Sequence, residues 1–372
     1  MNNLLFLFFY LILYICGYGI VHALKNSSQF NSDLNKNFLS SKNIFHCLYP
    51  IVALFILGNL NLILNFFMPV KTSILFILII FLILFILSLS LVVKNKYENF
   101  QLSTQIVFPL ILSVSSYGIQ FHYDAGAYHL GYQSWIYSEK IVFGLANINP
   151  YFSYGSINEY LYSIFSYFDI NLLYFFVDLV FFVSFFGFMF DLLKQSENLF
   201  LRNSALIIFI YTILDNFGYK GGGNGSLQIQ MVGKPDTAVG VLWVIVSLFV
   251  LNDLIQKNPS NFNFFIILLF SLFAFELKAN AGPLIFLVIL YFLKLERGTP
   301  ILKLPNLFLY FLSFIYLLKN FIISGCLIYP IVGSCIRNVS WLNYKHIEDS
   351  VVSLLSLNKA ISLNQDFLFT FN

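Results

Sequence analysis

Long apolar runs alternate with short polar breaks along the whole chain of 372 residues. Because a membrane-spanning helix needs about 20 mainly apolar residues, each run predicts one helix across a bilayer. We expect ten such helices, near residues 4–24, 44–66, 73–93, 104–120, 170–193, 204–217, 237–256, 262–277, 281–294 and 304–323. The pattern therefore predicts an all-α polytopic membrane protein in which residues 1–372 form a single membrane domain.

Composition favours a membrane protein over a water-soluble one. Hydrophobic residues make up 59% of the chain and charged residues 10%, and the mean hydropathy is +0.81. Too few polar side chains are present to cover a water-soluble globule. The net charge is +3 and the basic residues are scattered, so no face suits nucleic acid. The N-terminal run lacks a basic start and a small-residue cleavage site, and predicts a retained span rather than a removed signal peptide.

Lysine and arginine in the connections predict the orientation of the chain, because cytoplasmic connections carry an excess of these residues. Placing residues 25–43 in the cytoplasm collects on that side Lys25, Lys36, Lys42, Lys94, Lys96, Lys194, Arg202, Lys257, Lys294, Arg297 and Lys303. The opposite side then holds two outer loops, 121–169 and 218–236, and an outer tail, 324–372.

The stretch FHYDAGAYHLGYQSW gathers polar and aromatic side chains at the start of the first outer loop. Asp124 directly follows a predicted span. Tyr128, Leu130, Trp135 and Ile136 recur at roughly helical spacing, which predicts an interfacial amphipathic helix. A carboxylate at this boundary could act as a general base toward a hydroxyl or bind a metal ion. It could equally be the N-cap of the helix, with no chemical role.

Two histidines flank this acid. His122 and His129 could supply nitrogen ligands or a proton relay, but neither spacing matches a recognised metal motif, and a structural role is the alternative. A divalent metal ion, with Asp124 and His122 as candidate ligands, is the only cofactor that the sequence suggests.

The four cysteines fall into two pairs. Cys16 and Cys47 lie in apolar runs and are predicted to be small core residues. Cys326 and Cys335 could form a disulfide only if their loop faces an oxidising compartment.

The second outer loop, GYKGGGNGSLQIQMVGKPDTAVG, is rich in glycine but lacks the G-x-x-x-x-G-K-[ST] pattern of a nucleotide-binding loop. Its charged residues, Lys220, Lys234 and Asp236, could bind a phosphate or a sugar hydroxyl. A plain connecting loop is the alternative.

Charged residues also interrupt the later apolar runs. FELKANAGPL predicts a hairpin broken at membrane depth. Lys278 within it could neutralise a lipid phosphate, or could simply extend past a helix end. Lys319, near the outer end of the last span, is another candidate for a phosphate contact. Asp178 lies inside a span, where a carboxylate is costly, and is predicted to face the interior of the bundle.

Four segments together resemble a group of largely uncharacterised bacterial inner-membrane proteins. YDAGAYHLGYQSWIYSEKIVFGLANI resembles the YD-x-G-L-Y-H … W … V-P-G-L-A-N block of that group. GKPDTAV, FELKANAGPL and ISGCLIYP resemble its S-x-x-P-D, x-x-K-x-S-x-x-P-L and SG-x-x-x-YP blocks, in the same order over about residues 121–333. The chain departs from the blocks at Ala127, Phe143 and Ala279 to Ala281. Members of the group look longer, so the resemblance also implies a C-terminally truncated or divergent chain.

The architecture of that group is similar to that of the GT-C glycosyltransferases, which use polyprenyl-phosphate-linked sugars. The resemblance implies a GT-C-like fold in the bacterial inner (cytoplasmic) membrane, with the site on the periplasmic side. It implies that Asp124 is the catalytic acidic residue, that the partners are a polyprenyl-phosphate lipid donor and membrane lipid, and that a divalent metal could assist. The candidate substrate-binding residues are His129, Trp135, Lys234, Asp236, Lys278 and Lys319.

Three functions are open at this point. The favoured one is a membrane glycosyltransferase that moves a sugar from a polyprenyl-phosphate donor to a cell-envelope glycan or lipid. The alternative is a transporter or flippase of a lipid-linked glycan, which would predict internal inverted repeats; the two halves of the chain show no convincing self-similarity. A non-catalytic membrane subunit is the third.

Overall fold

The computed structural model describes residues 2–26, 45–94, 101–114, 121, 124–168, 172–195, 198–216, 235–256, 259–295 and 300–353. Within these ranges the chain forms α-helices joined by short 3-10 and π turns. These residues contain no β-strand, and only an isolated bridge pairs Cys326 with Cys335. The predicted all-helical class is confirmed.

The helices follow the predicted apolar runs closely. They are α1 (Asn2–Lys25), α2 (Tyr49–Asn65), α3 (Val70–Lys94), α4 (Phe108–Leu112), α5 (Leu130–Ser138), α6 (Ile157–Phe165), α7 (Leu172–Gln195), α8 (Leu199–Asn216), α9 (Asp236–Gln256), α10 (Asn261–Leu277), α11 (Leu284–Phe292) and α12 (Leu304–Ser324). A further helical segment covers 344–353.

The expected number of ten spans is not confirmed. Six helices among the described residues are long and apolar enough to cross a membrane: Asn2–Lys25, Phe45–Asn65, Val70–Lys94, Leu173–Lys194, Asp236–Gln256 and Leu304–Ser324. The remaining apolar helices, which include α10 and α11, are shorter. This composition is consistent with a multi-pass membrane protein.

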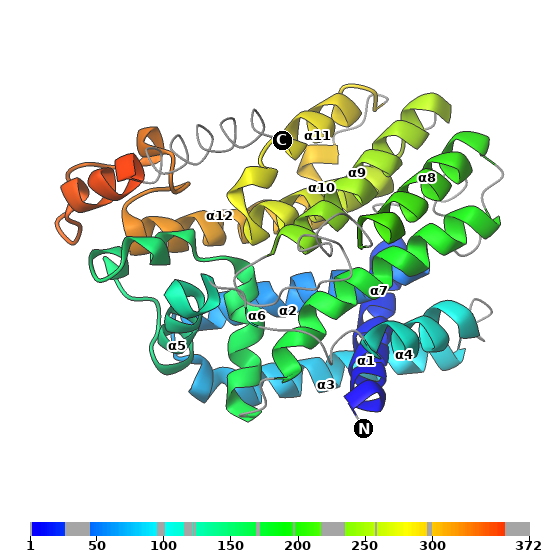
Figure 1. The fold of residues 1–372 in the computed structure, drawn as a ribbon, viewed down its shortest axis with the longest axis horizontal. Coiled ribbons are helices and arrows are strands. Elements are labelled where there is room, and N and C mark those ends of the chain that lie inside the picture. The colour runs from blue at the N-terminus through cyan, green and yellow to red at the C-terminus, as the bar shows by residue number, and fades with distance from the viewer. Residues whose placement is uncertain are drawn as a thin grey trace, which may run out of the picture.

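The helices pack around α2, which contacts α1, α3, α6 and α7. On the other side of the molecule α7 packs on α8 and α9, and α10 contacts both α9 and α12. In Figure 1, α2, α3 and α12 run roughly along the long axis, whereas α6 stands across it. The tail that follows α12 lies with α5 at the left end of the molecule in this view.

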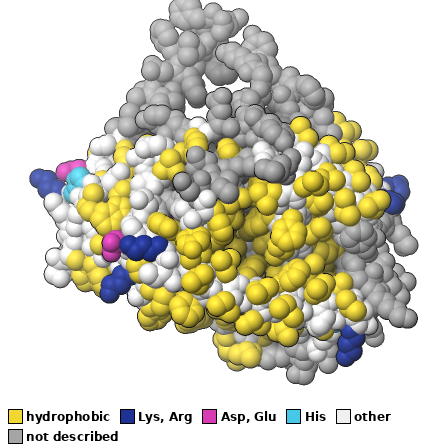
Figure 2. Space-filling model, turned by 90° about the horizontal axis from the view of Figure 1, so that it is seen from below, with side chains coloured by type: hydrophobic (Ala, Val, Ile, Leu, Met, Phe, Trp, Pro, Cys, Tyr) yellow, Lys and Arg dark blue, Asp and Glu magenta, His cyan; other side chains and the backbone are white. Residues whose placement is uncertain are grey.

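Apolar side chains cover the outside of the helices as well as their core. On α3, most side chains are exposed although the helix is almost wholly apolar; Leu75, Phe76 and Ile79 are examples. Figure 2 shows one broad hydrophobic face, with the charged side chains near its edges. Because soluble proteins rarely expose apolar patches of this extent, this surface fits a lipid environment.

Hydrogen bonds between buried polar side chains connect the helices. The hydroxyl of Tyr162 donates to Asp178 Oδ2 at 2.9 Å, and Asp178 is buried in the bundle, as predicted. Asn61 Nδ2 donates to the carbonyl of Tyr160 at 2.6 Å and to Ser163 Oγ at 3.1 Å. Lipid offers no hydrogen-bonding partner, so these contacts fix α6 against α2 and α7.

The C-terminal tail folds back onto the first predicted outer loop. Gly325 ends α12 with a left-handed φ of 67°, a conformation that favours glycine. Asn147 Nδ2 then donates to the carbonyl of Trp341 at 2.8 Å, and the amide of Asn343 donates to Asn147 Oδ1 at 2.9 Å. The described part of the predicted outer tail therefore lies on the same end of the bundle as that loop.

Two glycines let α1 approach its neighbours closely. A Cβ atom on Gly17 would lie 1.9 Å from the carbonyl oxygen of Tyr49, and one on Gly19 would lie 1.9 Å from Ser88 Oγ. Small residues at helix contacts allow backbones to come together in membranes. The backbone contact at Gly17 cannot be relieved by a side-chain rotation.

We expect Gly17→Ala to lower the thermal midpoint of the detergent-solubilised protein, because the added methyl group overpacks the contact at a cost of about 1–3 kcal/mol. Gly240→Ala on α9 is the matched control, since its Cβ would meet no atom within 4 Å. Alanine is the better helix former, so that variant should be neutral or slightly more stable. Equal thermal midpoints for the two variants would contradict the close α1–α2 packing.

Candidate functional site

Asp124 stands immediately before a π turn, Ala125–His129, that leads into α5. Its side chain is half-buried and makes no capping hydrogen bond to that turn. The alternative that Asp124 is merely a helix-capping residue is therefore wrong for this turn. Its carboxylate is part of the electrostatic surroundings of Tyr128.

Three acidic side chains from separate parts of the sequence act electrostatically on the Tyr128 hydroxyl. Burial raises the pKa of the Tyr128 hydroxyl, and the charges of Asp124, Glu159 and Asp236 raise it further. The hydroxyl therefore stays protonated at neutral pH and acts as a hydrogen-bond donor rather than as a base. The three acids lie far apart in sequence, so the fold brings the first and second predicted outer loops together here.

Asp236 and Lys278 form an ion pair at this surface. Lys278 Nζ lies 2.7 Å from Asp236 Oδ1, with the two side chains 41% and 44% exposed. Asp236 begins α9 and Lys278 follows the last residue of α10, positions where the helix dipoles favour a negative and a positive charge respectively. An exposed pair of this kind adds little stability, so either partner can exchange its contact for a ligand. Sequence spacing suggested both residues but not their pairing.

Lys319 lies beneath the surface rather than on it. Its side chain is fully buried, and its Nζ donates to the carbonyl of Gly155 at 2.6 Å. The Tyr316 ring centroid lies 4.3 Å from Nζ, and the charges of Glu159 and Glu276 act on the ammonium group. The predicted contact of Lys319 with a donor phosphate stays a prediction.

Glu159 is the residue that sequence reasoning missed. It lies on α6, inside the segment that was predicted to be the outer loop 121–169, but all nine residues of α6 are buried. His129 Nδ1 contacts Glu159 Oε1 directly, and the histidine is itself buried. An isolated acid in the otherwise uncharged helix INEYLYSIF is the same signal that identified Asp178, and could have found it.

Glu276 completes a buried row of ionisable groups. Asn59 Nδ2 donates to Glu276 Oε2 at 2.8 Å, and Glu276 is 1% exposed. The row runs from His129 through Glu159 and Lys319 to Glu276. One oxygen of each carboxylate, Glu159 Oε2 and Glu276 Oε1, has no hydrogen-bond partner among the described residues. Buried carboxylates are costly without partners, and the charge of Lys319 acts on both of them in addition to His129 at Glu159 and Asn59 at Glu276.

The other predicted site residues are Trp135, His122 and Lys234, and only Trp135 lies among the described residues. Trp135 is half-buried on α5 and lines a shallow hollow with Asn65, Lys140 and Tyr160. α5 packs on α6 and buries Tyr132 on that side. His122 and Lys234 lie outside the described residues, so the metal ligand and phosphate ligand expected there have no described geometry.

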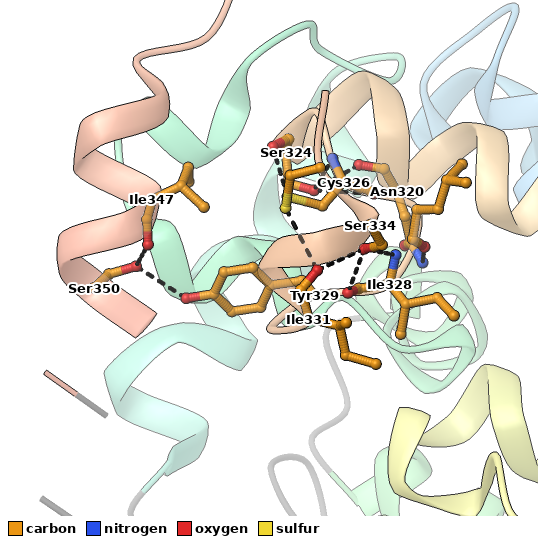
Figure 3. The surroundings of a disulfide bond; sticks show 11 residues. Asn320, Ser324, Cys326, Ile328, Tyr329, Ile331, Ser334, Ile347 and Ser350 are labelled. Carbon is orange, nitrogen blue, oxygen red and sulfur yellow. Dashed lines mark hydrogen bonds between the residues drawn. A yellow bond between two sulfur atoms is a disulfide. The ribbon is translucent and has the colours of Figure 1, made fainter. Parts of the chain in front are cut away.

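The ISGCLIYP segment lies in a disulfide-bonded turn at the same end of the bundle as Asp124 and the Asp236–Lys278 pair. Cys326 and Cys335 are bonded, which confirms the pairing that the sequence left open. Figure 3 shows the Tyr329 hydroxyl within hydrogen-bonding distance of Ser350, at 3.0 Å. The ring of Tyr329 packs edge-on against that of Tyr154, with centroids 4.8 Å apart. All four sequence blocks therefore meet at one end of the bundle.

We expect Lys319→Met to reduce the free energy of unfolding by about 3–5 kcal/mol, because it leaves buried carboxylates without their positive neighbour. Glu159→Gln alone should also destabilise, whereas the double variant should lose less than the sum of the two single losses. Denaturant titration in detergent measures the four values, and Lys345→Met, at an exposed position, is the control. Strictly additive losses would show that Glu159 and Lys319 do not interact.

Comparison with known proteins places the chain in a family. A family model described as a domain of unknown function, DUF8201, matches residues 1–357. The comparisons with curated proteins and with solved structures give no match. Because the family model covers nearly the whole chain, the protein belongs to the DUF8201 family.

Proposed function

We propose that the protein is a membrane glycosyltransferase that transfers a sugar from a polyprenyl-phosphate donor to a cell-envelope glycan or lipid. The observation that carries the proposal is the meeting of the four sequence blocks at one end of the bundle. There Asp124 and the Asp236–Lys278 pair share a surface around Tyr128, and the row His129–Glu159–Lys319–Glu276 lies buried close by. The GT-C-like architecture is part of this proposal.

We place this end of the bundle on the periplasmic side of a bacterial inner membrane. The bonded pair Cys326–Cys335 belongs to the tail at this end, and disulfides persist in oxidising compartments such as the periplasm. The contact of Tyr154 with Tyr329 connects that tail to the first loop. The excess of lysine and arginine in the opposite connections supports the same orientation.

In the proposed reaction, Asp124 accepts the proton of an acceptor hydroxyl as its oxygen attacks the anomeric carbon of the sugar. The bond from that carbon to the donor phosphate breaks, and polyprenyl phosphate leaves with the electron pair. Lys278 exchanges Asp236 for the negative charge of the phosphate, while the protonated Tyr128 donates a hydrogen bond to substrate. Asp124 suits the role of base because it is half-buried at the surface and close to Tyr128, whose ring packs against those of Tyr151 and Tyr154.

The buried row of charges also favours a second candidate, a transporter or flippase of the same lipid-linked substrate. Transporters hold ionisable groups within the membrane beside broken helices. The helical hairpin is broken here as predicted, because α10 ends at Leu277 and α11 begins at Leu284. A transporter would move the labelled donor across proteoliposomes without forming a covalent product.

Replacing the carboxylate of Asp124 by an amide should remove the base but keep the shape of the side chain. We expect Asp124→Asn to lower transfer from a labelled polyprenyl-phosphate sugar by at least about 100-fold, measured in right-side-out membrane vesicles that contain an acceptor. Asp349→Asn makes the same chemical change at an exposed position on the tail and should keep full activity.

Full transfer by the Asp124→Asn protein would refute the assignment of the base. Adding EDTA to the wild-type reaction separates the two roles open to this carboxylate. Activity that survives chelation assigns Asp124 as the base, and activity that is lost and then restored by Mg²⁺ or Mn²⁺ but not by Zn²⁺ assigns it as a metal ligand.

A further inference from the structure

A second cluster of chemically active side chains lies at the opposite end of α2. The turn before α2, Phe45–Leu48, carries His46 and Cys47, and α7 brings Asp191 to them. α2 ends at Asn65, whose side chain donates to the carbonyl of Ile136 beside the outer site. A helix of 17 residues is about 25 Å long, so the two clusters occupy different ends of the molecule.

The three donor atoms of this cluster contact one another. Cys47 Sγ lies 3.1 Å from Asp191 Oδ2 and 3.4 Å from His46 Nε2, and His46 Nε2 lies 3.3 Å from Asp191 Oδ2. The residues are at most 2% exposed. The thiol of Cys47 donates to Asp191 Oδ2 in this arrangement. All three atoms are also metal ligands, and a cation at the centre would contact them together.

The dimensions of the triangle match a tetrahedral zinc ion. Bond lengths of about 2.3 Å to sulfur, 2.0–2.1 Å to nitrogen and 2.0–2.2 Å to oxygen place neighbouring ligand atoms about 3.3–3.6 Å apart. The separations of His46 Nε2 from Asp191 Oδ2 and from Cys47 Sγ, 3.3 and 3.4 Å, lie within about 0.2 Å of the values for those pairs, and the Cys47–Asp191 separation of 3.1 Å would lengthen by about 0.5 Å around the ion. Thr104 Oγ1 lies 3.2 Å from the same His46 nitrogen and hydrogen-bonds to Cys47, so a fourth oxygen is within reach.

Two features of the surroundings favour a divalent ion. A thiolate and a carboxylate together carry two negative charges, so a divalent cation makes the buried site neutral, as an apolar interior requires. Gly187, one turn before Asp191 on α7, makes room for the thiol, because a Cβ there would lie 2.9 Å from Cys47 Sγ. Cysteine and histidine ligands select zinc over magnesium or calcium.

We propose that His46, Cys47 and Asp191 bind a structural zinc ion that joins the start of α2 to α7, with Thr104 beside it. The ion crosslinks two segments separated by 144 residues. The site is separate from the proposed transferase site, and its test uses no transferase activity.

The metal content of the full-length protein, purified in detergent without chelator, tests this site. We expect about one zinc per chain by elemental mass spectrometry in the wild type. Cys16→Ser is the matched control, because Cys16 is a buried free cysteine outside the cluster, and it should keep the zinc. Cys47→Ser and Asp191→Asn should each hold at least about fivefold less. Equal zinc in all four proteins would overturn the proposal.

A measurement on the wild type covers the case in which the variants do not fold. Protein stripped with EDTA and loaded with Co²⁺ should show thiolate-to-cobalt charge-transfer absorption and the visible bands of tetrahedral cobalt. Its thermal midpoint should fall on stripping and recover with added zinc. A wild-type protein that contains no zinc and gives no charge-transfer band with Co²⁺ would refute the site.

Discussion

The Glu159 carboxylate contacts His129 and acts through its charge on Lys319, and it thereby connects three elements at the end of the bundle that carries the candidate site. A charged carboxylate inside a membrane protein is stable only with a partner in place. Glu159 and these two partners lie on three elements: α6, the π turn before α5, and α12. Lys319 also binds the carbonyl of Gly155, just before α6. These contacts therefore connect the π turn, α6 and α12.

The end of the bundle that carries the candidate site has a buried layer and an exposed layer. The buried groups His129, Glu159, Lys319 and Glu276 are each at most 6% exposed. Above them, Asp124 and the Asp236–Lys278 pair are at least partly exposed, so they can change partners at little cost. Buried groups beneath exchangeable charges suit the proposed transferase site, because the buried groups would fix geometry while the exposed groups meet substrate.

The sequence predicted the helices better than it predicted their partners. Apolar runs locate spans because lipid demands hydrophobic length, and every predicted run contains or overlaps a helix in the described residues. The count of spans differed because α10 and α11 are short. Hydropathy predicted that Lys319 lies near one end of the last span. It did not predict which side of α12 faces the core, so the burial of Lys319 was not expected. The Asp236–Lys278 pair depends on the rotation of two helices, which spacing does not reveal. Glu159 was missed because a polar connecting segment was expected to stay outside the bundle.

The central claim is that segments far apart in sequence form one surface around Asp124, and the exposed ion pair tests it most directly. Zero-length carbodiimide coupling joins a carboxylate to an amine only when the two groups are in contact. Peptide mass spectrometry of the protein treated in native membranes should find Asp236 bonded to Lys278. A Lys278 amine that couples to a different carboxylate, or that stays uncoupled while Asp236 is activated, would contradict the account.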